Sequence, residues 1–156
     1  MKYLVVGLLS VCLIGILSFK PIEKLANNNG EVKATAGGIS FIEGDWEKTL
    51  AKAKVEKKLI FVDAYATWCG PCKKLQNEVF PDATVGTYFN KNYINITIDV
   101  EKGQGVEFAQ KYGVEVLPTL YITDDNGNPI TYTKGYMSAS DLLKFGQFGV
   151  QKASKK

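Results

Sequence analysis

Cys69 and Cys72, separated by Gly70 and Pro71, are the residues whose types and spacing most clearly predict chemistry in this chain. Pro71 is typical of the first turn of a helix, and the apolar segment 59–65 before the pair is typical of a buried strand. Two cysteines three residues apart at a helix start can close a small disulfide across one turn. The unpaired N–H groups and partial positive charge of a helix N-terminus stabilise a thiolate at Cys69.

The two cysteines are expected to have different roles. A thiolate is the attacking species in disulfide exchange, so Cys69 is the expected nucleophile. Cys72 lies one turn deeper, and we expect it to resolve the mixed disulfide by attacking Cys69 and releasing the reduced substrate. A structural disulfide is the first alternative, although so small a ring constrains the unfolded chain little. A zinc site is the second, although residues 27–156 offer two cysteines and no histidine for four ligand positions.

The residue types that are missing narrow the function further. The chain has no histidine, and all 19 of its basic residues are lysines. The absence of histidine excludes histidine acid–base catalysis, Cys-His dyads and c-type haem attachment. The absence of arginine excludes the guanidinium groups that often bind phosphate. The net charge is +3, and it is +1 once residues 1–26 are set aside. So balanced a domain predicts no nucleic-acid partner, and we expect no metal and no cofactor.

Two further features could assist the cysteines. Asp63 lies inside an apolar segment, six residues before Cys69, so we expect it to be buried beneath the active-site turn. Burial raises the pKa of a carboxyl group, and Asp63 could then take the proton from Cys72 as that thiol attacks. The alternative is a hydrogen-bonded structural carboxylate. The Leu117-Pro118 pair begins an apparent strand, which fits an edge position or a cis peptide bond.

Apolar segments alternate with segments of helical periodicity from residue 39 onward. The sequence predicts strands at 39–41, 59–65, 93–99, 119–123 and 130–133, the last two joined by a hairpin. It predicts helices at 71–79, 82–90 and 105–112, one capped by Asp45 with Trp46, Leu50, Ala51 and Ala53 facing inward, and one begun by Ser138 and Asp141. This order predicts an α/β fold with a mixed sheet.

The chain divides into four parts by composition. Residues 1–26 combine a basic start with the uncharged run 3–19, typical of a signal peptide or an N-terminal membrane anchor. A helix of this run spans about 25 Å, less than the roughly 30 Å hydrocarbon core, which favours a cleaved signal peptide. Residues 27–38 predict a flexible linker, 39–150 a folded domain and 151–156 a disordered tail.

Residues 61–73, FVDAYATWCGPCK, resemble the strand, buried acid and active-site turn of the thioredoxin family. Leu117-Pro118-Thr119 resembles the cis-proline of that family, and Gly135 resembles the glycine that completes its substrate groove. The resemblance covers 41–148 and implies a thioredoxin fold, with a central mixed β-sheet flanked by helices. Residues 77–89 and 135–137 look similar to the C-terminal periplasmic domain of the membrane electron-transporting thiol reductase.

The resemblance implies an exported thiol–disulfide oxidoreductase that reduces protein disulfides through the Cys69–Cys72 pair. It implies a monomer in the periplasm or tethered to the outer face of the inner membrane, in contact with the membrane only through an uncleaved N-terminal segment. A membrane thiol reductase would be the redox donor, and disulfide-containing proteins would be the substrates. The substrate-binding residues would be Trp68, Gly70, Pro71, Leu117, Pro118 and Gly135.

This interpretation has alternatives, and the sequence departs from the family pattern at two positions. A thiol oxidant or isomerase would use the same cysteines, and a binding or chaperone module would not need them. Tyr65 stands where thioredoxin has tryptophan, and Asn95 stands where it has the lysine that neighbours the buried acid. Losing that lysine removes a positive neighbour of Asp63 and is expected to change its pKa.

Overall fold

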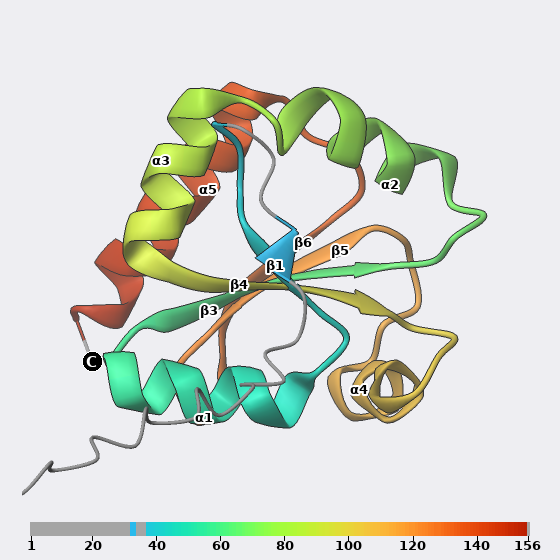
Figure 1. The fold of residues 1–156 in the computed structure, drawn as a ribbon, viewed down its shortest axis with the longest axis horizontal. Coiled ribbons are helices and arrows are strands. Elements are labelled where there is room, and N and C mark those ends of the chain that lie inside the picture. The colour runs from blue at the N-terminus through green and yellow to red at the C-terminus, as the bar shows by residue number, and fades with distance from the viewer. Residues whose placement is uncertain (1–31, 34–36, 156) are drawn as a thin grey trace, which may run out of the picture.

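A computed structural model describes residues 32–33 and 37–155. These residues form a six-stranded sheet in the order β1-β2-β4-β3-β5-β6, with helices on both faces (Figure 1). The strands are β1 (Val32–Lys33), β2 (Phe41–Glu43), β3 (Leu59–Tyr65), β4 (Tyr93–Asp99), β5 (Thr119–Thr123) and β6 (Pro129–Lys134).

The sheet is mixed, as the order of strands and helices predicts. Strands β2, β4 and β3 run parallel to one another, because a helix joins each to the next in sequence. Strand β5 pairs antiparallel with β3, and the β5–β6 hairpin adds the outer antiparallel strand. The predicted α/β class with a mixed sheet is therefore confirmed.

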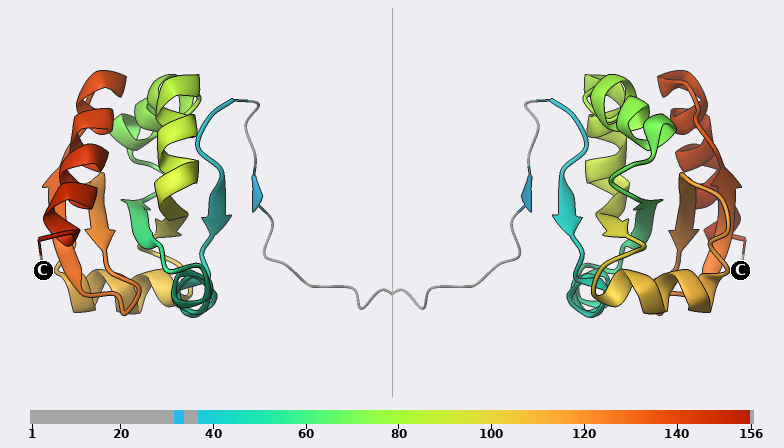
Figure 2. Two further views of the ribbon diagram at one scale, coloured as in Figure 1. Left: turned by 90° about the vertical axis from the view of Figure 1, so that its left-hand side faces the viewer. Right: turned by 90° about the vertical axis from the view of Figure 1, so that its right-hand side faces the viewer.

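The helices cover the sheet in two groups. Helices α2, η1, α3 and α5 lie on one face, and α1 and α4 lie on the other, as the two side views in Figure 2 show. Their bounds are α1 (Trp46–Glu56), α2 (Gly70–Lys74), the π-helical η1 (Leu75–Val79), α3 (Ala83–Asn92), α4 (Gln104–Tyr112) and α5 (Ala139–Ala153).

Strand β3 is covered on both faces, which explains why its sequence is almost continuously apolar. Ile60 and Val62 face a core that includes Trp46 and Phe108, under α1 and α4. Phe61 faces the other core, in which its ring lies 4.6 Å from that of Phe89, centroid to centroid. A polar residue on this strand is consequently buried, and this determines the environment of Asp63.

The predicted helix starts are confirmed at two positions. The Asp45 carboxylate accepts a hydrogen bond of 2.9 Å from the Lys48 backbone N–H and caps α1. The Ser138 hydroxyl accepts from the Asp141 N–H and donates to the Asp141 carboxylate, which caps α5. Such caps satisfy backbone N–H groups that have no partner within the helix.

Several expectations about local structure were wrong. Ala51 is exposed, because the inward face of α1 instead includes the fully buried Thr49. The strand expected at 39–41 covers 41–43, where backbone pairing with β4 begins. The helix expected over 71–79 widens at Leu75 into η1, in which the Phe80 N–H donates to the Leu75 carbonyl. This π-helical turn keeps Leu75, Val79 and Phe80 all in the core.

The structure also differs in part from the predicted linker and the predicted tail. Strand β1 lies within the expected linker 27–38 and pairs with the open edge of β2. Helix α5 continues to Ala153, into the expected tail, because Val150 and Ala153 still pack against the core. The expected signal peptide or anchor, residues 1–26, lies outside the described residues. Within the part that the structure describes, no helix has the length and apolarity to cross a membrane.

Candidate active site

The two cysteines lie where β3 meets α2, and they form a disulfide with an S–S distance of 2.01 Å. Cys69 is the N-cap residue of α2, and its Sγ atom accepts a hydrogen bond of 3.2 Å from the Cys72 backbone N–H. Pro71 occupies the first turn, where its missing N–H costs nothing. The helix N-terminus is thus directed at the sulfur of Cys69, as the sequence predicts.

The disulfide is shielded by small and apolar side chains. Cys72 is 1% exposed and Cys69 only slightly more, at 2%. Ala66 is buried with them, and Leu117 packs against the same cluster. The sequence predicted that Cys72 lies one turn deeper than Cys69, but the oxidised structure covers most of Cys69 as well.

Trp68 is the large exposed residue beside the disulfide. Two-thirds of its surface is exposed (67%), yet its indole N–H donates a hydrogen bond of 2.8 Å to Glu101. Glu101 follows β4 and was not predicted as a site residue. No sequence motif marks Glu101, because its contact with Trp68 depends on β3 and β4 lying side by side. The hydrogen bond fixes the orientation of an otherwise free aromatic surface.

The segment before β5 brings the second part of the predicted site to the cysteines. The Leu117–Pro118 peptide bond is cis. The Pro118 carbonyl accepts a hydrogen bond of 2.7 Å from the Gly135 N–H, so these two predicted residues are held together. Gly135 has a φ of +89°, a conformation that favours glycine.

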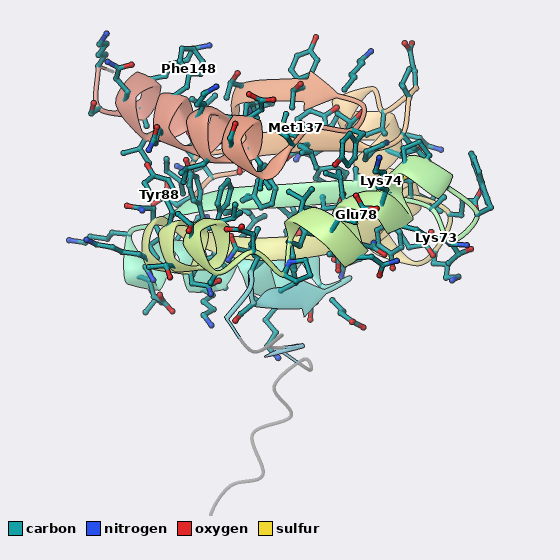
Figure 3. The ribbon with its side chains drawn as sticks, turned by 90° about the horizontal axis from the view of Figure 1, so that it is seen from above. Lys73, Lys74, Glu78, Tyr88, Met137 and Phe148 are labelled. Carbon is teal, nitrogen blue, oxygen red and sulfur yellow. A yellow bond between two sulfur atoms is a disulfide. The ribbon has the colours of Figure 1, made fainter. Side chains whose placement is uncertain are left out.

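The segment after Gly135 reaches α2. The Lys74 ammonium lies 4.6 Å from the centre of the Tyr136 ring, a cation–π contact between the two. Figure 3 shows Lys73, Lys74 and Glu78 along α2 and η1, with Met137 on the segment that leads into α5. Tyr136 was not predicted as a site residue, although it is 42% exposed and offers an aromatic surface beside Lys74 of α2.

Asp63 is fully buried on the face of the sheet that α2 and η1 cover. Neither carboxylate oxygen has a hydrogen-bond partner among the described residues. Burial raises its pKa from 3.8 to about 7, and the nearby Gln76 amide offsets part of this effect. The geometry makes Asp63 a group that can gain or lose a proton near neutral pH.

Asn95 does not provide a positive charge beside Asp63. It lies opposite Phe61 in the β3–β4 register, and its amide donates to the Ser40 carbonyl and to the Asn90 side chain. The leading cause of the raised pKa of Asp63 is accordingly its burial and not a charged neighbour. Tyr65 is half-buried, and burial together with Asp99 and Glu43 raises the pKa of its phenol.

Metal binding has no geometric basis in the described residues. No group of three or more histidine, cysteine, aspartate or glutamate side chains within 32–33 and 37–155 is arranged to hold an ion.

Comparison with known proteins assigns the class. Residues 46–149 match the family model of the thioredoxin-like domain, so this chain belongs to that family. Thiol:disulfide interchange protein DsbD of Vibrio vulnificus (strain YJ016) is 32% identical over 120 residues, which are 72% of this chain and 20% of that protein. The chain thus spans about a fifth of the length of that relative. Thioredoxin-1 of Drosophila melanogaster is 33% identical over 53% of this chain and 70% of its own length.

Solved structures agree with this assignment. A candidate disulphide-isomerase from Bacteroides thetaiotaomicron is 45% identical, with a TM-score of 0.66 over 75% of this chain and 97% of that chain. The oxidised C-terminal domain of Neisseria meningitidis DsbD has a TM-score of 0.57 at 16% identity, over 66% of this chain and 90% of that chain, and so shows the fold alone. The predicted thioredoxin fold and family are confirmed.

Proposed function

We propose that this protein is an exported thiol–disulfide oxidoreductase that reduces disulfides in other proteins. The observation that carries the proposal is the Cys69–Cys72 disulfide at the N-terminus of α2, with Cys69 as the capping residue. This arrangement presents the Cys69 sulfur to a helix N-terminus, with both cysteines largely buried. The thioredoxin-like family assignment and the similarity to DsbD support the same chemistry.

The reaction has two exchange steps. In the reduced protein, the Cys69 thiolate attacks a substrate disulfide, one substrate sulfur leaves as a thiolate, and a mixed disulfide forms. Cys72 then loses its proton and attacks Cys69, which forms the disulfide of the structure and releases the second substrate thiolate. Two electrons pass from the dithiol to the substrate, and the helix N-terminus stabilises each thiolate that forms at Cys69.

Asp63 is the base that we propose for the second step. Its pKa of about 7 leaves part of the population ionised at neutral pH and able to accept the Cys72 proton. Among the described residues only the Gln76 amide stabilises its charged form, and burial outweighs that effect. This argues against the alternative of a hydrogen-bonded structural carboxylate.

The substrate surface that we propose surrounds the disulfide. It consists of Trp68, Gly70, Pro71, Leu117, Pro118 and Gly135. The exposed indole of Trp68 offers an apolar contact, and an extended substrate segment would lie beside Pro118. Such a surface recognises backbone and general apolarity, so we expect it to accept many substrate sequences.

The N-terminal sequence and the relatives support a proposal for location and partners. We propose that residues 1–26 direct export, as a cleaved signal peptide or as an anchor on the outer face of the inner membrane. Residues 27–38, which contain strand β1, would connect this segment to a monomeric domain. The similarity to DsbD supports a membrane thiol reductase as the electron donor.

Thiol oxidation or isomerisation is a second candidate function. The 45% identity to a candidate disulphide-isomerase from Bacteroides thetaiotaomicron favours it specifically. Equilibration with glutathione separates the two functions, because thioredoxin has a potential of about −270 mV and strongly oxidising members lie near −120 mV. We expect a value near that of thioredoxin, and a value near the oxidising limit would reject the reducing assignment.

Reduction of insulin disulfides tests the proposal directly. The wild-type protein with dithiothreitol should precipitate insulin faster than dithiothreitol alone. The Cys69→Ser variant should give only the background rate, because it lacks the nucleophile. Full activity of the Cys69→Ser variant would overturn the assignment. Glu107→Gln, an exposed position on α4, is a matched control that should retain wild-type activity.

A further inference from the structure

A buried base needs both solvation and a route for its proton. Asp63 has no exposed surface, and neither of its carboxylate oxygens has a hydrogen-bond partner among the described residues. Buried polar groups without a protein partner are commonly hydrogen-bonded to water. The cysteine side of Asp63 offers little for this, because apart from Tyr65 the side chains around the disulfide are small or apolar.

A row of polar side chains leads from Asp63 to the surface on the opposite side. Asp63 is paired with Thr97 in the β3–β4 register, and Thr97 is paired with Glu43 in the β2–β4 register. Phe41, Asn95 and Phe61 form the preceding row of the same pairing, and both phenylalanines lie in the core under η1. Because side chains alternate along a strand, the row of Glu43, Thr97 and Asp63 lies on that same face.

This row has the dimensions of a short relay. Adjacent strands lie about 4.8 Å apart, so the backbones of Glu43 and Asp63 are separated by about 10 Å with Thr97 between them. Thr97 is half-buried and Glu43 is exposed, so the row runs from the interior to solvent. A threonine hydroxyl can donate and accept a hydrogen bond at the same time, as a relay requires.

A cavity of about 290 Å³ lies over this row. Its polar lining includes Glu43, Thr97, Tyr65 and Gln76, and its apolar lining includes Phe41 and Phe80. Asp63 does not line the cavity, but Thr97 is its register partner, Tyr65 is on its own strand, and Gln76 is the amide that affects it. The cavity is polar and large enough to hold several water molecules.

We propose that this cavity is the hydration and proton-exchange site of Asp63, with Thr97 and Gln76 as the positioning residues that connect it to the carboxylate. The inference rests on the proposed function and adds to it the route by which the base is reset. Cys72 gives its proton to Asp63 during the resolving step. Asp63 then passes a proton through Thr97 to cavity water, and the exposed Glu43 carboxylate or bulk solvent accepts it.

The charged and titratable groups around the cavity are consistent with this role. Glu43 faces it from β2 and Tyr65 from β3. Asp99 at the end of β4 is paired with Lys102 at 2.8 Å. Burial, Asp99 and Glu43 raise the pKa of Tyr65, so its phenol stays protonated at neutral pH and can donate a hydrogen bond. On the α2 side, Cys72 becomes titratable once the disulfide is reduced.

Thr97→Val and Gln76→Leu test the proposal, since each removes polar atoms from the cavity lining at little change in size. Thr133→Val is the matched control, because Thr133 is half-buried in the same row, beyond Leu120, and does not line the cavity. The Asp63 carboxyl group is titrated by ¹³C NMR in each oxidised protein. The resolving step is followed by stopped-flow fluorescence of the reduced proteins mixed with excess peptide disulfide, across the pH range.

The two cavity variants should titrate Asp63 about one pH unit higher than wild type, the size expected when one water-mediated hydrogen bond to the carboxylate is lost. The pH profile of the resolving step should shift upward with it, whereas Thr133→Val should match wild type. Either cavity variant suffices if the other fails to fold. Equal titration in the cavity variants, the control and wild type would overturn the inference. The proposed function would be rejected by a different result, namely a wild-type protein that does not reduce the peptide disulfide. The NMR titration does not depend on activity, so the two failures can be told apart.

Discussion

Replacing Asp63 by asparagine should stabilise the protein in a pH-dependent way. The pKa of Asp63 is 3.8 unfolded and about 7 folded, so the folded state holds a proton that the unfolded state has lost between these values. Stability therefore falls as the pH rises through this window. The full penalty, reached above pH 7, is about 4 kcal/mol, since each unit of pKa shift corresponds to about 1.4 kcal/mol.

Urea unfolding of the oxidised protein at pH 4 and pH 8 measures this effect. Asp63→Asn should gain several kcal/mol over wild type at pH 8 and much less at pH 4, where wild-type Asp63 is protonated. Glu107→Gln provides the control for loss of one exposed acid and should change stability little at either pH. An Asp63→Asn variant with the same advantage at both pH values would refute the reasoning, because its gain would not come from ionisation.

The same variant should lose the proposed base. Since general base catalysis commonly contributes about 10²–10⁴-fold, the resolving step at pH 7 should slow by at least about 100-fold. The first attack by Cys69 should change much less. Stopped-flow fluorescence of the reduced protein with excess peptide disulfide separates the two phases, and an unchanged second phase would remove Asp63 from the mechanism.

Three other predictions concern packing and the active-site surface. Phe89→Ala should destabilise the fold by about 3–5 kcal/mol in urea unfolding, because Phe89 is fully buried between core rings; a loss below 1 kcal/mol would contradict this packing. Gly105→Ala should lower the melting temperature sharply, since its Cβ would clash with the Asp99 carbonyl oxygen; an unchanged melting temperature would show that the contact can relax. Glu101→Gln should increase the mobility of Trp68, measured by fluorescence anisotropy decay, because the charged partner of its indole is lost; an identical decay would show that the hydrogen bond does not hold the ring.

Much of the fold could be predicted because local signals and tertiary structure agree. Strand β3 has the predicted bounds, since a segment buried on both faces must be apolar throughout. The caps at Asp45 and Ser138 were predictable because capping depends on residues within one turn. The position of the cysteines at a helix start was predictable from Pro71, because proline favours the first turn of a helix and this signal is also local.

The features that could not be predicted depend on contacts between distant segments. Glu101 becomes a partner of Trp68 only through the pairing of β3 with β4. Strand β1 exists because the edge of β2 is open, and no strand pattern in residues 27–38 indicates it. The row of Glu43, Thr97 and Asp63 requires the register of three strands, which sequence periodicity alone does not fix.

The most direct test of the central claim is the identity of the covalent intermediate. The reduced Cys72→Ser variant is mixed with a peptide disulfide, alkylated and analysed by mass spectrometry. We predict a stable adduct of one peptide, attached at Cys69, and no adduct in the Cys69→Ser variant. An adduct that forms on Cys72 in the Cys69→Ser variant as fast as on Cys69 in the Cys72→Ser variant would contradict the assignment of nucleophile and resolving cysteine.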